Sequence, residues 1–255
     1  MKKAILVVSF GTSYTENREK TLHAIEKTIA NKYGKIYTAY TSKMILKKIL
    51  KRDGISLCNV TQAFEQMKKD GITDVLVQPT HILNGIENDL MKEDALAFEK
   101  DFNSIAFGDP LITTTEDIFE VVKGLGATYG DVSEKTAVVF MGHGSEHVVN
   151  TTYAAIDYAF KDLGYANFFM GTVEGYPELE QVIKLLKKGN YKNVLLAPFM
   201  IVAGDHANND MIGNEEDSWL NQLTKEGFNV AYRMTGLGEL SFIHNIFLNH
   251  IERVK

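Results

Sequence analysis

The chain has little cysteine, proline or tryptophan: of its 255 residues, one is Cys, four are Pro and one is Trp. The single thiol, Cys58, excludes an internal disulfide framework, a cysteine-rich zinc site and a cysteine-rich iron–sulfur site. Basic residues are not in excess either, because 27 Lys and Arg face 33 Asp and Glu, a formal net charge of −6. General nucleic-acid binding normally needs a basic stripe and is not expected, although local cations can still bind a small anion.

Long apolar runs are also missing. No run approaches the ~20 residues that span a bilayer, so no membrane association is expected. The apolar start at residues 4–10 is shorter than the core and cleavage site of a secretory signal peptide, and polar residues follow it. We therefore expect a cytoplasmic protein. Apolar residues make up 45% and charged residues 24%, which is typical of a globular chain with a sizeable core.

Two segments of the chain resemble each other. Residues 65–79 (EQMKKDGITDVLVQP) match residues 184–198 (KLLKKGNYKNVLLAP) in the lysine pair, the valine–leucine run and the final proline, and residues 5–13 (ILVVSFGTS) resemble residues 138–145 (VVFMGHGS). Self-similarity between two parts of a chain indicates a structural repeat. We predict an N-terminal α/β lobe over 1–130 and a similar C-terminal α/β lobe over 131–255.

Within each half, short apolar runs alternate with helical patterns. Val/Ile/Leu-rich runs predict buried strands at 3–9, 35–40, 73–78, 136–141, 166–173 and 193–202. A helical period predicts helices at 15–31, 43–51, 60–69, 179–188 and 240–254. This alternation predicts an α/β, bilobal fold in which each lobe has a parallel sheet flanked by helices, with an active-site cleft between the lobes. Ligands of such folds bind beyond the carboxyl ends of the strands.

Three side chains of the second half follow predicted strands at nearly equal spacing. His143, Glu174 and His206 lie 31 and 32 residues apart, about one strand–helix–strand unit each. Successive parallel strands bring such residues to one edge of the sheet, so we expect the three to lie together. Two imidazoles and a carboxylate suit a divalent cobalt, nickel, iron or zinc ion. The second lobe is therefore predicted to carry a metal site.

At these residues the chain resembles a known family. Residues 140–144 (FMGHG), 173–177 (VEGYP) and 202–210 (VAGDHANND), together with residues 5–13, are similar to the anaerobic sirohydrochlorin cobaltochelatases, which are class II chelatases. The similarity extends nearly end to end. It implies a bilobal chelatase that inserts Co²⁺ into sirohydrochlorin, or its oxidised form, in anaerobic cobalamin biosynthesis. It also implies Co²⁺ ligands at His143, Glu174 and His206, and no cofactor beyond this substrate metal.

The resemblance further implies that His143 accepts a proton from the substrate. Metal insertion removes two pyrrole N–H protons, and imidazole has an ordinary pKa near 6.5, which suits a base at neutral pH. Glu174 offsets the charge of the cation and is the candidate to collect the second proton. One nitrogen cannot hold a proton and a metal at the same time, so the two steps have to be sequential.

Sirohydrochlorin carries eight carboxylates, so a net acidic chain needs local cations to bind it. A short basic segment follows the second predicted strand, and Arg52 at its end is suited to bidentate carboxylate binding. The segment contains Lys43, Lys47, Lys48, Lys51 and Arg52. A solvated helix face is the alternative interpretation.

A turn after the first predicted strand is the other predicted substrate contact. Gly11, Thr12 and Ser13 are predicted to present backbone N–H groups and a helix N-terminus to a carboxylate, and Phe10 to stack on the macrocycle. Phe10 is equally plausible as an apolar strand end. His81, which follows the proline of the first repeat, is predicted to line the cleft.

Other functions stay open at this point. A tetrapyrrole or metal carrier on the same fold, a chelatase for iron or nickel, and a metal-dependent hydrolase would also use a His/Glu set. No nucleophile-elbow or zinc-protease motif supports the hydrolase. The expected partners are sirohydrochlorin and a divalent metal. The oligomeric state is not fixed by the sequence, and a homo-oligomer is one alternative.

Overall fold

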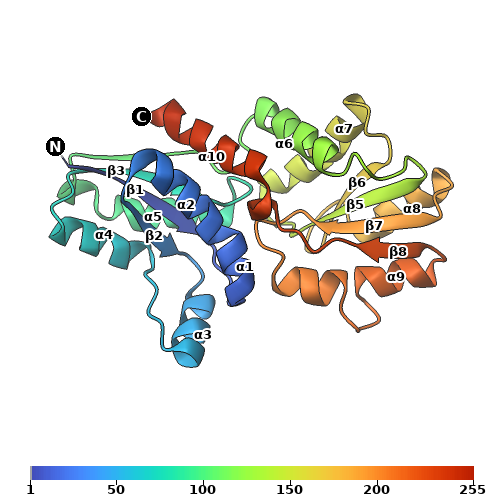
Figure 1. Cartoon of the computed structure of the whole chain (residues 1–255), viewed down its shortest axis with the longest axis horizontal. Coiled ribbons are helices and arrows are strands. Elements are labelled where there is room, and N and C mark those ends of the chain that lie inside the picture. The colour runs from blue at the N-terminus through green and yellow to red at the C-terminus, as the bar shows by residue number, and fades with distance from the viewer. Residues whose placement is uncertain (1) are drawn as a thin grey trace. The chain divides into compact units, whose positions relative to one another are not determined.

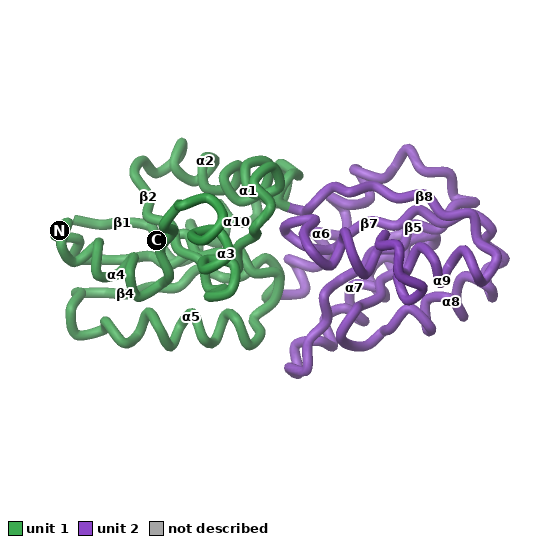
Figure 2. The backbone as a smooth tube through the Cα atoms, turned by 90° about the horizontal axis from the view of Figure 1, so that it is seen from below, with its two compact units in different colours: residues 1–113, 238–255 green, residues 114–237 purple. Residues whose placement is uncertain are grey.

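The computed structural model describes residues 2–255, which divide into two compact units (Figure 2). Unit 1 contains the chain up to Thr113 together with Gly238–Lys255, and unit 2 contains Thr114–Leu237. This division differs from the predicted lobes at 1–130 and 131–255. Helix α6 (Thr115–Thr128) packs on helix α7 (Thr151–Asp162) of unit 2, and helix α10 (Ser241–Val254) returns to pack on unit 1.

Side-chain hydrogen bonds account for the return of α10. Thr28 Oγ1 lies 3.1 Å from His244 Nδ1, and the backbone oxygen of Asp109 accepts a hydrogen bond from His250 Nδ1 at 3.1 Å. The apolar face of α10, with Ile243, Ile246, Phe247 and Ile251, is fully buried. The similarity between the two halves does not predict that α10 packs on unit 1. A terminal helix can bury its apolar face on any available apolar surface.

Unit 1 is built on a parallel sheet with strand order β2-β1-β3-β4 in the described residues (Figure 1). The strands are β1 (Lys3–Ser9), β2 (Ile36–Tyr40), β3 (Asp74–Pro79) and β4 (Ser104–Phe107). The helices are α1 (Thr15–Lys20), α2 (Leu22–Tyr33), α3 (Lys43–Asp53), α4 (Val60–Lys69) and α5 (Ile86–Leu96), with a short turn η1 (Glu99–Asp101). Ala4, Leu6 and Val8 of β1 pack with α4 and α5, as the two-residue period of a strand requires.

Unit 2 repeats this plan, with strand order β6-β5-β7-β8 in the described residues and parallel pairing throughout. The strands are β5 (Thr136–Gly142), β6 (Phe168–Thr172), β7 (Asn193–Pro198) and β8 (Asn229–Tyr232). Besides α6 and α7, the helices are α8 (Leu179–Lys188) and α9 (Trp219–Lys225), with short turns η2 (Val148–Asn150), η3 (Ala207–Met211) and η4 (Leu237–Glu239). Ala137, Val139 and Met141 of β5 pack with α8 and α9.

The predicted α/β fold of two similar units, each with a parallel sheet flanked by helices, is confirmed, whereas the cleft between them stays a prediction. Several elements that were missed or altered have simple physical reasons. The repeated segments fall on α4–β3 and α8–β7, which occupy the same place in each unit. Strands β4 and β8 were not predicted, because each is a four-residue edge strand with partly exposed side chains. The predicted helix at 15–31 is two helices that meet at Thr21, and the strand predicted at 193–202 ends at Pro198.

No helix within residues 2–255 combines the length and apolar character needed to cross a membrane.

Each sheet should depend on a buried leucine in one of its two central strands. Leu6 of β1 and Leu196 of β7 are both fully buried, so Leu6→Ala and Leu196→Ala should each lower the free energy of unfolding by about 2–5 kcal/mol. Leu50→Ala is the control, because Leu50 is 52% exposed, and its effect should stay within about 0.5 kcal/mol. Urea denaturation followed by circular dichroism measures all three. Equal effects at the buried and exposed positions would contradict the assigned cores.

Candidate metal site

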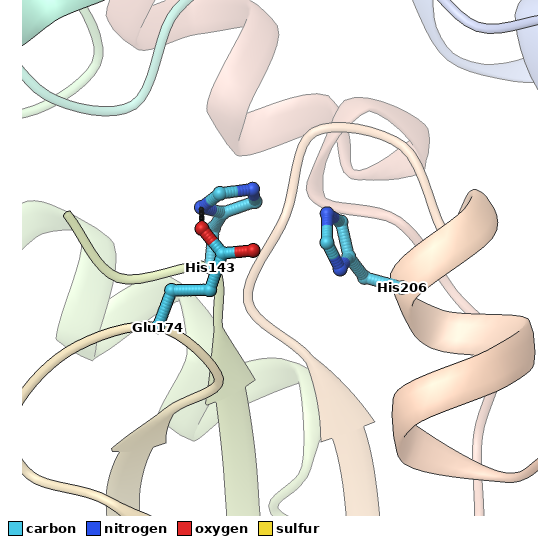
Figure 3. A group of neighbouring side chains, drawn as sticks. All are labelled: His143, Glu174 and His206. Atoms are coloured by element: carbon cyan, nitrogen blue, oxygen red, sulfur yellow. Dashed lines mark ion pairs between the residues drawn. The ribbon is translucent and has the colours of Figure 1, made fainter.

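Three side chains meet at the carboxyl edge of the unit 2 sheet (Figure 3). His143 follows β5 directly, Glu174 lies two residues beyond the end of β6, and His206 lies between β7 and η3. Each contributes one ligand atom, and these atoms all lie within 4.8 Å of one another. The structure therefore brings together the three residues that the spacing of the sequence pointed to.

Backbone pairing fixes His143 and Glu174 side by side. The ladder between β5 and β6 continues past both strands, because Val173 N donates to Gly142 O at 3.1 Å and Glu174 N donates to His143 O at 2.8 Å. Gly144 has φ +90°, and a Cβ there would lie 2.6 Å from Gly175 N. Only glycine combines this backbone conformation with such a close approach.

Asn150 ties the two ligand-bearing loops together. Its Oδ1 accepts a hydrogen bond from Ser145 N at 3.0 Å, and its Nδ2 donates to Tyr176 O at 2.8 Å. One side chain thus joins the loop after β5 to the loop after β6, in addition to the backbone pairing of His143 and Glu174.

Hydrogen bonds also set the tautomers of both imidazoles. His143 Nδ1 lies 2.9 Å from Gly144 O, which can only accept, so Nδ1 carries the proton and Nε2 keeps its lone pair. His206 Nδ1 lies 2.7 Å from Asp210 Oδ2, one turn further along the chain. A carboxylate on the far nitrogen of a histidine holds the ring and increases the basicity of the other nitrogen, as in many metal sites.

The trio is open to a ligand and internally complementary. The side chains of His143, Glu174 and His206 are 47%, 59% and 35% exposed. Glu174 Oε2 lies 3.8 Å from His143 Nδ1, which makes an ion pair when the imidazole is protonated. The two imidazole rings stand nearly perpendicular, with centroids 4.4 Å apart. Two nitrogen donors and one anionic oxygen at these separations can share one divalent ion.

The predicted substrate-binding turn lies at the carboxyl edge of the unit 1 sheet, and its residues differ in accessibility. Phe10 is 45% exposed and Gly11 is half-buried with φ +105°, whereas the Thr12 and Ser13 side chains are buried. Thr12 Oγ1 accepts a hydrogen bond from Tyr14 N at 3.2 Å. An exposed aromatic side chain is thus available at this edge, while the Thr12 hydroxyl bonds within the turn and the Ser13 side chain is buried.

Arg52 is engaged by its neighbour. Its Nε and Nη2 donate to the two carboxylate oxygens of Asp53, each at 2.6 Å, and Nη2 also lies 3.4 Å from Thr15 Oγ1. The bidentate binding predicted for a substrate carboxylate is therefore directed to Asp53 in this structure. To bind a substrate carboxylate, the Arg52 guanidinium would first have to release Asp53.

His81 follows β3 and has both ring nitrogens buried without a well-aligned hydrogen bond. Burial lowers the pKa of His81 to about 4, with the nearby Asn88 side chain acting weakly in the opposite direction. The imidazole is therefore neutral near pH 7. It is not part of the His143 cluster, since it belongs to the other unit.

Two residues of the site were missed by the sequence analysis. The contact of Asp210 could have been predicted, because Asp210 lies four residues after His206, a spacing that allows a contact across one helical turn. The role of Asn150 could not have been predicted from the sequence, because its two hydrogen-bond partners are backbone groups of separate loops.

Two α/β units with parallel sheets, and a His/Glu cluster that could hold a metal at the strand ends of one of them, are the features expected of a chelatase-type protein. Family comparison makes this specific. The chain matches the family "Cobalt chelatase (CbiK)" over residues 3–255 and belongs to that family. The resemblance noted in the sequence is confirmed.

Individual relatives agree with this family. The chain is 34% identical to "Sirohydrochlorin cobaltochelatase" of Salmonella typhimurium, covering 99% of this chain and 96% of the relative. It is 28% identical to "Sirohydrochlorin cobaltochelatase CbiKC" of Nitratidesulfovibrio vulgaris, covering 98% and 89%. Among solved structures, SirB from Bacillus subtilis with Fe³⁺ has the same fold, with a TM-score of 0.69 at 19% identity and coverage of 99% and 95%.

The close approach of Gly144 gives a direct test of the site's construction. Gly144→Ala should push the Glu174 loop away from His143 and weaken Co²⁺ binding roughly 10–100-fold, the range found for residues that orient metal ligands. Gly164→Ala is a matched control, because Gly164 also has φ +90° but has nothing within 4 Å of a Cβ. Titration calorimetry with Co²⁺ measures both variants. Equal affinities for the two would contradict the proposed packing.

The buried imidazole of His81 should make stability depend on pH. An unfolded chain has an ordinary imidazole pKa near 6.5, whereas the folded pKa is about 4. Between these values the unfolded state binds the extra proton, so the free energy of unfolding falls as the pH falls from about 6.5 towards 4. At pH 4.5 the His81 contribution to this loss is roughly 2 kcal/mol.

Replacing the imidazole removes this proton-binding difference. His81→Gln should therefore lose less stability than the wild type between pH 7 and pH 4.5, as measured by urea unfolding at both pH values. A His81→Gln variant with an unchanged difference would show that His81 is not held neutral by burial.

Proposed function

We propose that this chain is a sirohydrochlorin cobaltochelatase, in which His143, Glu174 and His206 hold the incoming Co²⁺ before it enters the macrocycle. Membership of the cobalt chelatase family supports the reaction, and the names of the two relatives supply the tetrapyrrole. The observation that carries the site assignment is the convergence of three metal-ligating atoms within 4.8 Å at an open sheet edge.

The three ligand residues suit a metal ion that the protein has to release to the macrocycle. Three protein ligands leave coordination positions open for water and then for the pyrrole nitrogens, whereas a closed four-ligand site would retain the ion. Imidazole and carboxylate bind Co²⁺, Ni²⁺, Fe²⁺ and Zn²⁺, with an affinity order that does not favour cobalt. Cobalt is therefore assigned here from the family and its relatives.

Insertion exchanges one divalent ion for two pyrrole protons, so the protein has to accept protons as it releases the metal. His143 is the proposed first acceptor. Its Nδ1–H is held by Gly144 O, so the free lone pair of Nε2 is the atom that takes the proton. Because Nε2 cannot hold metal and proton together, it releases Co²⁺ before it is protonated.

Glu174 stabilises the product of that step. Its carboxylate lies 3.8 Å from His143 Nδ1 and forms an ion pair with that ring once the ring is protonated. Through the same carboxylate it is the proposed acceptor of the second proton. His206, held by Asp210, stays available as a metal ligand throughout.

Substrate contacts in unit 1 are the remaining part of the proposal. The exposed face of Phe10 supports stacking on the macrocycle, with Gly11, Thr12 and Ser13 forming the turn that presents it. Substrate binding by Arg52 and His81 stays a prediction, because Asp53 binds the Arg52 guanidinium and the ring nitrogens of His81 are buried. The cytoplasmic location and the absence of a further cofactor also stay predictions.

A reconstituted assay tests the function. Purified protein, sirohydrochlorin and Co²⁺ are mixed without oxygen and without any other component, and the absorption spectrum is followed. We expect a rate proportional to protein concentration over many equivalents of substrate. A single stoichiometric spectral change would instead identify a carrier, and faster turnover with Ni²⁺ or Fe²⁺ would identify a different chelatase.

The role of His143 is tested in the same assay. His143→Ala removes the first proton acceptor and a metal ligand, so turnover should fall roughly 10²–10⁴-fold. His23→Ala is the control, because His23 lies on α2 and pairs with Glu19 at 3.0 Å, and its rate should be unchanged. A near-normal rate for His143→Ala would remove this residue from the mechanism.

A further inference from the structure

Helix α3 starts at the carboxyl edge of the unit 1 sheet. Thr41 N donates to Ser9 O at 2.9 Å and Ser42 N donates to Phe10 O at 3.2 Å, which fixes the residues before the helix to the end of β1. Ser42 then caps the helix by accepting from Ile45 N. The side chain of Ile45 packs on Gly11 of the adjacent turn. The first turn of α3 is therefore held against the turn that presents Phe10.

Beyond this first turn, α3 lies at the lower edge of unit 1 in Figure 1, and at its C-terminal end Arg52 Nη2 lies 3.4 Å from Thr15 Oγ1 of α1. Among the described residues 43–53 that form α3, Ile49 is the single fully buried side chain. Met44 is 77% exposed and Leu50 is 52% exposed. A helix with so little burial has its outer faces available to a ligand.

Three lysines form a row along one exposed face of this helix. Lys43, Lys47 and Lys51 are exposed and lie four residues apart, a spacing that places them on one line over about 12 Å of helix. Within residues 2–255, no carboxylate lies within ion-pair distance of any of the three. We call Lys43, Lys47 and Lys51 the lysine row.

The other two cations of the segment are already engaged. Arg52 forms its fork with Asp53, and Lys48 Nζ lies 5.9 Å from the centroid of the Tyr14 ring. Asp53 is the only acidic residue in α3, and the first turn of the helix has none. The lysine row thus has no counter-charge on its own helix.

This arrangement is unfavourable without an anion. Like charges four residues apart repel across a helix face, and Lys43 lies at the positive end of the helix dipole. A multivalent anion spread along the row would offset both effects. The overall charge of −6 makes this cationic surface a local exception in the chain.

We propose that the lysine row binds peripheral carboxylates of the tetrapyrrole substrate, an inference that rests on the proposed function. The substrate is a polycarboxylate, and the row begins beside the turn that presents Phe10. Binding through several exposed ammonium–carboxylate pairs favours macrocycles with many carboxylates over those with few. The row thereby selects an early, highly carboxylated tetrapyrrole. The lysines therefore replace Arg52 as the main cations of the basic segment.

Equilibrium binding of porphyrins tests the row independently of metal insertion. The probes are uroporphyrin, with eight carboxylates, and coproporphyrin, with four, followed by fluorescence with the full chain. The test variant combines Lys43→Gln, Lys47→Gln and Lys51→Gln. Its affinity for uroporphyrin should fall roughly tenfold, as three partly screened ion pairs allow, and its affinity for coproporphyrin should fall less. The difference from wild type should shrink at high salt.

Matched variants separate the row from net charge. Lys3→Gln, Lys69→Gln and Lys100→Gln together remove the same charge from exposed positions of unit 1, at or just before the starts of β1, β3 and β4 and so at the opposite edge of its sheet. This control should leave uroporphyrin affinity within about twofold of wild type, because solvent and salt screen distant exposed charges. Arginine at the three row positions should retain affinity. Wild-type affinity in the row variant, or an equal loss in the control, would overturn the proposal.

Turnover distinguishes this inference from the proposed function. If wild-type protein inserts Co²⁺ into sirohydrochlorin, the row variant should show a raised KM for sirohydrochlorin and an unchanged kcat, and an unchanged KM would overturn the role of the row. A wild-type protein that binds uroporphyrin through the row without turnover would contradict the proposed function and leave the carboxylate site in place.

Discussion

The continuation of backbone pairing beyond β5 and β6 is the constraint on which the site depends. Glu174 N donates to His143 O, so the two ligand residues are adjacent before either side chain is considered. Gly144 permits this approach because it has no Cβ, and Asn150 locks the following loops. His206 arrives from the neighbouring strand β7, held by Asp210. The proposed metal ligands are thereby positioned by the hydrogen-bonded edge of a parallel sheet.

The two units share a plan but differ in chemistry. Both have the same strand order, yet only the edge of unit 2 brings metal-ligating side chains together among the described residues. The corresponding edge of unit 1 presents Phe10 and begins the cationic helix α3. This asymmetry divides the proposed work: one sheet edge holds the cation and receives protons, and the other offers an aromatic face and positive charge to a polyanionic macrocycle.

Periodicity and repetition were enough to predict the central strands, the α/β class and the convergence of His143, Glu174 and His206, because parallel strands always deliver their carboxyl ends to one edge. The edge strands β4 and β8 were missed because they are short and partly exposed. The return of α10 to unit 1 was missed because it depends on packing between distant segments. Arg52 shows a further limit of prediction from sequence. Its charge is evident from the sequence, whereas its bidentate hydrogen bonds to Asp53 depend on side-chain geometry. Oligomeric state and metal preference have no local pattern that would reveal them.

The central claim is that one Co²⁺ ion binds to His143, Glu174 and His206 with coordination positions left open. Anomalous diffraction at the cobalt edge from crystals grown with Co²⁺ tests it most directly. The account predicts one strong anomalous peak within bonding distance of both imidazoles and the carboxylate, with water completing the shell. A peak elsewhere, or a cobalt shell that lacks either imidazole, would contradict it.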